Sequence, residues 1–264
     1  MLSTRFSIIF ATVAIVSSPA QNPRPSASTT LLDASRMATP APSIPSLTPL
    51  DSERRADILM ARKMFREAID VYREGPADSA ITWNKIGIAY HQLLDFNAAK
   101  KNYEKALKLN SNYAEAINNI GTVYYAEKSY RRAIARYKKA LRLNPNSASF
   151  YSNLGTAYFA RKNYKEAAEN YQKALELDPE VFEHRSGFGT TMQERTVAER
   201  AKFHYYLAKT YAKAGQSERA LLYIRKALEE GFTERKKFME EPEFTSLRAL
   251  PEFKELLFLE PRVL

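Results

Sequence analysis

Residues 114–147 read AEAINNIGTVYYAEKSYRRAIARYKKALRLNPNS, and residues 148–181 read ASFYSNLGTAYFARKNYKEAAENYQKALELDPEV. The second stretch repeats the pattern of the first at an interval of 34 residues, and residues 80–113 carry a third copy. Each copy has a glycine three residues before a tyrosine and twelve before an alanine, as Gly121, Tyr124 and Ala133 show in the middle copy. A fixed period of this length indicates an array of equal structural units.

Each copy has the pattern of two helices. In residues 80–113, apolar residues recur at helical spacing over residues 82–93 and again over 97–109. Gly87 and Ala99 are small enough to let the two helices approach closely, and Tyr103 fills the space beside their contact. Because neither helix can bury its apolar side alone, neighbouring copies must stack.

The combined spacing resembles the tetratricopeptide repeat. The resemblance implies an all-α fold, an α-solenoid of helix–turn–helix repeats that winds as a right-handed superhelix. It also implies that the protein binds a protein or peptide through the concave face, which is lined by the first helix of each pair. We expect this solenoid to span residues 51–264, with units at about 51–79, 80–113, 114–147, 148–181 and 201–234, an insertion at 182–200 and a C-terminal cap at 235–264.

The first unit is shorter than the others. Leu59, Ala68 and Tyr72 match the repeat when displaced by 31 residues instead of 34. We therefore expect a shortened turn before Gly75-Pro76.

The insertion at 182–200 is rich in turn residues and also contains Phe182, Phe188 and Met192. Apolar residues are unnecessary in an inert linker, so this segment is either a recognition loop or a segment that packs on the stack. The sequence leaves both readings open. Beyond it, we expect the next first helix to begin near Thr196.

The N-terminus has a different composition. Arg5, an apolar run over 6–16 and the small residues around Ala20 predict a secretory signal peptide at residues 1–20. The run is shorter than the roughly 20 apolar residues of a membrane-spanning helix, so we expect no stable membrane anchor, a retained anchor being the alternative. Residues 21–50 hold six of the thirteen prolines and predict a disordered tether. We expect the protein to be exported, to the periplasm or the extracellular space.

The sequence offers little for catalysis. The three histidines, His91, His184 and His204, belong to different segments, and there is no cysteine. No metal-binding, nucleophile or phosphate-loop motif occurs. We therefore expect no catalytic residue, no metal, no cofactor and no enzyme activity. Trp83 and the tyrosines recur at helical spacing, which favours core packing over a stacking surface for bases or a cofactor.

The net charge is +10, and many of the lysines and arginines lie on the second helices. This distribution is typical of a solvated outer face, although it would also attract an anionic partner. Interleaved Glu104, Glu166 and Glu169 argue against a continuous phosphate-binding track, so we expect no specific nucleic-acid partner.

The candidate binding residues lie on the side of each first helix that faces away from its partner helix. They combine amides and hydroxyls, which can bond a peptide backbone, with apolar groups that can accept its side chains. The set is Asn84, Ile88, His91, Asn118, Asn119, Thr122, Tyr125, Ser152, Thr156, Phe159, Tyr205 and Lys209.

We interpret the chain as an adaptor of an exported or envelope assembly that binds a protein or peptide through this set. The alternatives are a self-associating scaffold and a binder of anionic polymers through the basic surface. The residues name neither the partner nor the oligomeric state.

Overall fold

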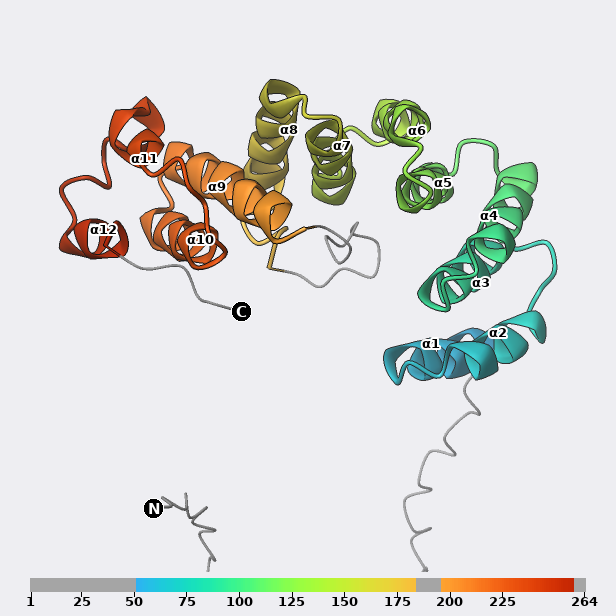
Figure 1. Ribbon diagram of the computed structural model, residues 1–264. Helices are drawn as coiled ribbons and strands as arrows, with labels where there is room; N and C mark the ends of the chain where they lie inside the picture. Colours follow the sequence, from blue (N-terminus) through green and yellow to red (C-terminus); the bar gives the residue numbers. More distant parts are fainter. Residues whose placement is uncertain (1–50, 184–195, 259–264) are drawn as a thin grey trace, which may run out of the picture. The chain divides into compact units, whose positions relative to one another are not determined.

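The computed structural model describes residues 51–183 and 196–258, and every regular element in these ranges is a helix (Figure 1). Successive helices pack as pairs. The predicted all-α solenoid is confirmed. The first helices of the pairs are α1 Ser52–Ala61, α3 Ala80–Gln92, α5 Ala114–Ala126, α7 Ala148–Ala160 and α9 Val197–Lys213, and the second helices are α2 Phe65–Arg73, α4 Phe96–Leu109, α6 Tyr130–Leu143, α8 Tyr164–Leu177 and α10 Ser217–Glu229.

Several first helices begin at a side chain that accepts a backbone N–H of the first turn, which satisfies an otherwise unpaired donor. Asp51 accepts from Arg54 and Ser79 from Thr82. Thr196 caps α9 in a capping box, since it accepts from the N–H of Glu199 at 3.2 Å while the Glu199 carboxylate accepts from the N–H of Thr196 at 3.2 Å. The first helix after the insertion therefore begins where the sequence expects it.

Each pair turns through one residue in the left-handed backbone region. After α3, the N–H of Asp95 donates to the carbonyl of Tyr90 at 3.0 Å, so the last carbonyls of the helix are satisfied as the chain reverses. The same closure follows the other first helices. The residues with positive φ are Lys63 at 60°, Leu94 at 61°, Lys128 at 58°, Lys162 at 63° and Gly215 at 74°.

The two helices of a pair meet at a glycine and a tyrosine. A β-carbon on Gly87 would lie 2.5 Å from the ring of Tyr103, and one on Gly155 would lie 2.6 Å from the ring of Tyr171. Both tyrosines are buried. The glycine of the repeat is thus required because the tyrosine ring occupies the space of a side chain.

The first unit differs from the expectation in one respect. α2 has nine residues whereas α4 has fourteen, and the link that follows α2 runs over residues 74–79, longer than the link 110–113 that follows α4. The prediction of a shortened turn before Gly75-Pro76 is therefore wrong, because the helix is shortened instead. Pro76 cannot continue a helical hydrogen-bond ladder, which ends α2 early.

Neighbouring pairs stack through the second helix of one and the first helix of the next, as in α4 with α5 and α6 with α7. First helices also contact one another, α3 with α5 and α5 with α7. These contacts bury the apolar sides that a single pair leaves open.

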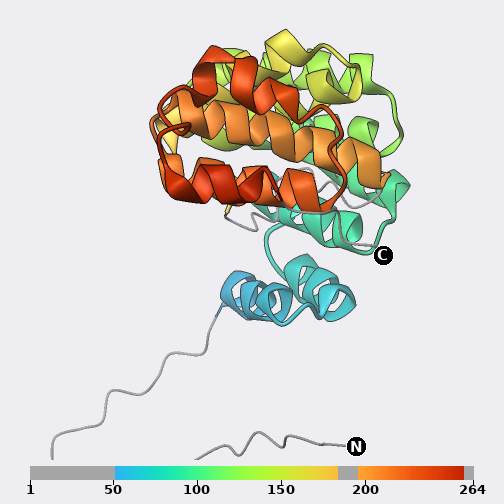
Figure 2. The ribbon, with the colours of Figure 1, turned by 60° about the vertical axis from the view of Figure 1, so that its left-hand side comes forward.

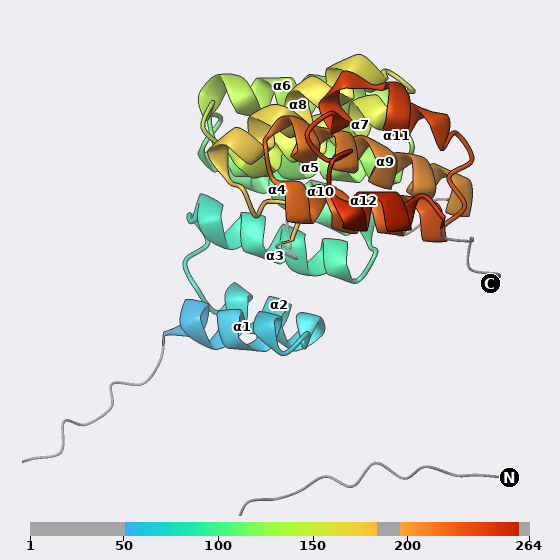
Figure 3. The ribbon, with the colours of Figure 1, turned by 90° about the vertical axis from the view of Figure 1, so that its left-hand side faces the viewer.

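The end of the stack is covered by short elements: α11 Lys236–Glu240, the 3-10 helix η1 Pro242–Phe244 and α12 Pro251–Leu256. Figures 2 and 3 show them beside α9 and α10, in agreement with the contacts of η1 with α9 and of α12 with α10. Phe238, Phe244, Leu247 and Phe253 are completely buried there. These side chains cover the apolar side of the last helix pair, α9 and α10, which in the other pairs is covered by the next repeat.

The expectations for a signal peptide, for a tether and for His184, Phe188 and Met192 of the insertion lie outside the described residues. None of the helices within the described ranges has the length and apolarity needed to cross a membrane.

Candidate partner-binding face

The twelve candidate residues lie on four first helices, and the structure divides them by exposure. His91, Tyr125, Ser152 and Lys209 are half-buried. The others are buried: Asn84, Ile88, Asn118, Asn119, Thr122, Thr156, Phe159 and Tyr205. The buried members therefore make contacts within the stack, which the sequence did not predict.

The buried amides form a continuous chain of hydrogen bonds, which we call the amide ladder. Asn119 Nδ2 donates to Asn84 Oδ1 at 3.0 Å, which joins α5 to α3. Asn118 Nδ2 donates to Asn119 Oδ1 at 3.2 Å, and Asn153 Nδ2 on α7 donates to Asn118 Oδ1 at 3.1 Å. The ladder fixes three successive first helices in register, because a buried amide without a partner would be costly.

Asn153 is a member that the sequence analysis missed. It lies 34 residues after Asn119, so the repeat register could have identified it. The hydrogen bonds between helices join residues 35 positions apart, one more than the repeat period. The repeat pattern alone therefore does not indicate whether Asn118 or Asn119 bonds to the asparagine of a given neighbouring helix.

A second polar group lies next to the ladder. Thr122 Oγ1 donates to the carbonyl of Asn119 at 2.8 Å and lies 3.5 Å from His91 Nδ1. The His91 ring meets Phe96 edge-on at a centroid distance of 5.2 Å. Burial lowers the pKa of His91 below its ordinary value. The ring is therefore neutral at pH 7 and offers a partner a hydrogen bond without charge.

Two aromatic members of the set, Tyr125 and Phe159, pack against other aromatic rings. Phe159 packs edge-on against Tyr164 and Phe203, with ring centroids 5.4 and 5.5 Å away. Tyr125 lies against Tyr130 at 5.3 Å. Tyr125 is half-buried, so the stack does not enclose this residue completely.

Tyr205 and Lys209 are engaged by the C-terminal cap. The Tyr205 ring stacks on Phe232 with centroids 4.5 Å apart. Lys209 Nζ lies 2.9 Å from a Glu241 carboxylate oxygen and 3.4 Å from one of Glu243. Burial, and then the neighbouring Glu241, raise the pKa of Tyr205. The structure thus places these two residues in the packing of the cap, apart from the amide ladder.

The chemistry of this face is hydrogen bonding and apolar contact. The described residues contain no group of three or more histidine, aspartate or glutamate side chains placed to hold a metal ion. His91 lies on α3 and His204 on α9. His204 Nδ1 instead lies 2.8 Å from a carboxylate oxygen of Glu230, the residue that follows the last turn of α10.

Known proteins resemble this chain at the level of its repeats. The family described as "Tetratricopeptide repeat" matches residues 80–113 and 148–181, and the family described as "TPR repeat" matches residues 121–160. Functionally curated proteins offer no match.

Several solved structures are also similar. The crystal structure of MamA is 23% identical, with a TM-score of 0.45 over 70% of this chain and 96% of that chain. MamA 41-end from Desulfovibrio magneticus RS-1 is 22% identical, with a TM-score of 0.46 over 68% and 92%. YrrB, described as a TPR protein with an unusual peptide-binding site, is 19% identical, with a TM-score of 0.43 over 75% and 91%. The family matches, on helix pairs built as described above, identify tetratricopeptide repeats in this chain.

Proposed function

We propose that the protein is an adaptor that binds a protein or peptide through the exposed edge of the amide-ladder face, within an exported or envelope assembly. Tetratricopeptide-repeat proteins act as protein-interaction modules, which supports the general role. The observation that carries the proposal is the amide ladder, since it holds α3, α5 and α7 in one register. The same three helices carry the half-buried His91, Tyr125 and Ser152, one on each.

These three side chains suit an extended peptide segment. The imidazole of His91 and the hydroxyl of Ser152 can exchange hydrogen bonds with peptide amides, and the Tyr125 ring can accept an apolar side chain. The ladder beneath them is already ordered in the free protein, so binding would cost little additional conformational entropy. None of these three side chains would form an ion pair with the peptide at pH 7. We therefore expect the affinity for the peptide to depend only weakly on salt.

A site-specific photo-crosslinker tests this proposal. We would place it singly at His91, Tyr125 and Ser152, and at Lys108 and Lys139 as exposed controls on the second helices α4 and α6. Crosslinked products in the native envelope fraction would be identified by mass spectrometry. One partner captured from the first three positions and absent from the controls is the expected result.

Capture from α4 and α6 alone would overturn the assignment of the face. Crosslinks only between copies of the chain, with a sedimentation coefficient that rises with concentration, would favour a scaffold instead. Capture that disappears steeply with added salt would favour a binder of anionic polymers.

Export is part of the same proposal and is supported by the leader pattern of residues 1–20. Intact mass of the protein from its native host should correspond to a chain that begins at Gln21 or within a few residues of it. A full-length species that begins at Met1 and is retained in membranes would contradict export by cleavage.

A further inference from the structure

The short helix α2 leaves a gap in the outer part of the stack. Tyr72 and Tyr103 occupy equivalent positions, yet α2 ends one residue after Tyr72 whereas α4 continues to Leu109. In the next pair, Leu107 from the last turn of α4 packs against Ile117 and its buried neighbours. No residue of α2 corresponds to Leu107, so the matching space in the first pair is not filled.

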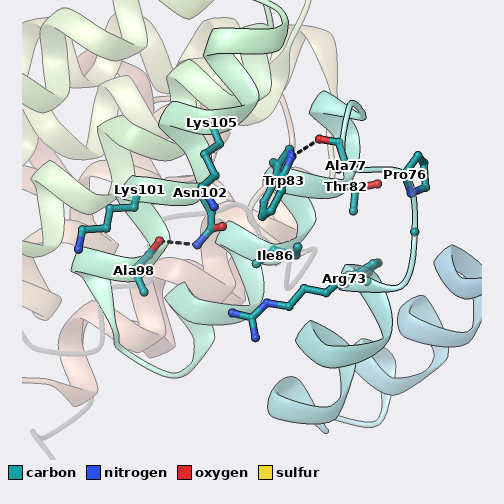
Figure 4. Close-up of a pocket in the computed structure, with 12 residues that line it drawn as sticks. Arg73, Pro76, Ala77, Thr82, Trp83, Ile86, Ala98, Lys101, Asn102 and Lys105 are labelled. Carbon is teal, nitrogen blue, oxygen red and sulfur yellow. Dashed lines mark hydrogen bonds between the residues drawn. The ribbon is translucent and has the colours of Figure 1, made fainter.

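A pocket of about 320 Å³ occupies this space (Figure 4). Its apolar wall includes Trp83 and Ile86 of α3, Ala98 of α4, and Pro76 and Ala77 of the link. Trp83 stands where the next repeats have Ile117 and Tyr151, and its indole N–H donates to the Ala77 carbonyl at 2.7 Å. This hydrogen bond holds the ring at the pocket wall. The volume falls in the range of sites that take a side chain or small ligand.

The charged residues that line the pocket are all cations. They are Arg73, Lys101 and Lys105, and no aspartate or glutamate lines the pocket. Lys105 Nζ lies 4.1 Å from the centre of the Trp83 ring. Arg73 Nη1 lies 3.5 Å from Asp70 Oδ1, and Arg73 Nη2 donates to the Tyr90 hydroxyl at 2.8 Å. Lys101 and Lys105, in contrast, make no ion pair with the described residues. In Figure 4 the Lys105 side chain lies beside Trp83 and the Arg73 guanidinium lies below Ile86, whereas the Lys101 side chain extends toward the left of the view.

We infer that this pocket, the Trp83 pocket, is a second docking site, for an acidic peptide segment that carries one large apolar side chain. The apolar side chain fills the space that the missing turn of α2 leaves beside Trp83 and Ile86. Flanking carboxylates of the peptide pair with Lys101, Lys105 and Arg73, because the pocket supplies positive charge with no lining acid to oppose it. None of the twelve residues of the concave-face set lines this pocket, so the two sites can be tested separately.

The probe is a short fluorescent peptide with one central phenylalanine between pairs of glutamates. Its two matched peptides replace the glutamates by glutamines, or the phenylalanine by serine. Fluorescence anisotropy with the full chain should show binding of the first peptide, and at least about tenfold weaker binding of each of the others, since each removes one half of the recognition.

Two protein variants locate the binding. The charge-reversed variant Lys101→Glu/Lys105→Glu should weaken binding by about tenfold or more. Its control, Arg131→Glu/Lys139→Glu, makes the same change of charge at exposed positions of α6 and should change affinity by less than about threefold. Ala98→Leu fills the pocket from α4 and keeps every cation, so it should also abolish most of the binding.

All variants change surface or pocket-lining positions, and circular dichroism would verify their folding. Equal losses in the two charge-reversed variants would show attraction to overall charge and overturn the proposal. So would unaltered binding by Ala98→Leu, or equal affinity for the glutamine peptide. Because His91, Tyr125 and Ser152 are intact throughout, failure here leaves the proposed adaptor function untouched.

Discussion

Gly121 on α5 lies so close to Tyr137 on α6 that a β-carbon at position 121 would stand 2.6 Å from Cε1 of the tyrosine ring. Tyr137 is completely buried, so its ring is shielded from solvent by the surrounding residues. The same relationship joins Gly87 to Tyr103 and Gly155 to Tyr171. Each of these repeats therefore combines a glycine on the first helix with a tyrosine on the second, whose ring occupies the space of the missing side chain.

Replacing Gly121 by leucine should lower the free energy of unfolding by about 1 to 3 kcal/mol, because the new side chain must displace the Tyr137 ring. The loss should extend to neighbouring repeats, whose stability is shared across their interfaces. Urea unfolding followed by circular dichroism measures it. Ala135→Leu, at an exposed position of α6, is the control and should change little. An unchanged urea midpoint for Gly121→Leu would mean that the helices can separate there without cost.

The left-handed turns predict a gain in stability. Leu94 and Lys128 have φ values of 61° and 58°, a region that costs a residue with a side chain about 1 to 2 kcal/mol. Leu94→Gly and Lys128→Gly should each raise the free energy of unfolding by about 0.5 to 1 kcal/mol, after subtraction of the greater entropy of glycine in the unfolded chain. Lys138→Gly, in the middle of α6, should instead destabilise by about 1 kcal/mol. Thermal unfolding of the three variants would measure whether stability rises for Leu94→Gly and Lys128→Gly and falls for Lys138→Gly.

The amide ladder predicts a coupling between two buried side chains. Asn119→Ala should destabilise by about 1 to 3 kcal/mol, since it leaves Asn84 Oδ1 buried without its donor. Asn84→Ala should also destabilise. The double variant should lose less than the two single losses together, by about 1 kcal/mol, because both partners are then gone. Asn97→Ala, at an exposed position of α4, provides the baseline. Strictly additive losses would show that the bond between the two amides contributes nothing.

The two half-buried histidines of the described residues predict that acid destabilises the protein. Burial lowers the pKa of His91, and burial also lowers that of His204 despite its contact with Glu230. The unfolded chain therefore takes up protons more readily than the folded chain, so stability is fully present above the unfolded value of 6.5 and declines as the pH falls below it.

The measurement for this prediction is urea unfolding at pH 7.5 and at pH 5.5. His91→Gln should lose less stability between these two conditions than the unaltered protein does. An identical loss in both proteins would exclude His91 as a source of the pH dependence.

The sequence predicted the parts of the fold that depend on periodicity. Gly121 and Ala133 recur with the period, and a small residue at a fixed place in two helices indicates a close contact. The sequence does not identify Leu94 and Lys128 as left-handed turn residues, because the usual signal is glycine, and among the turns within the described helix pairs only the one at Gly215 has it. Here the hydrogen bonds that close each helix hold a costly backbone conformation in place.

The candidate site was predicted less completely. Helical spacing placed the amides together on one side of α3 and α5, but spacing does not indicate how deeply a side chain is buried. The burial of Asn118 and Asn119 depends on how closely neighbouring pairs stack, which is a tertiary property. For the same reason the displacement of 31 residues signalled a deletion near Gly75 without showing that a helical turn was lost and that a pocket remained beside Trp83.

Of the three apolar residues singled out in the insertion, Phe182, Phe188 and Met192, Phe182 lies within the described part of the chain, and it packs on the stack. Its ring meets Tyr171 edge-on at a centroid distance of 5.4 Å and Tyr211 at 6.2 Å. Phe182→Ala should therefore lower the free energy of unfolding by about 1 to 3 kcal/mol, less than for a fully buried phenylalanine because the ring is half-exposed.

Thermal and urea unfolding measure this loss, and Met239→Ala, at an exposed position of the cap, serves as the control. Capture of the crosslinked partner would be measured with the same variants. A stability loss with capture retained supports packing of Phe182 between the fourth and fifth pairs. Lost capture with an unchanged unfolding transition would instead make this residue part of a recognition loop, and would show that its contacts with Tyr171 and Tyr211 do not stabilise the fold.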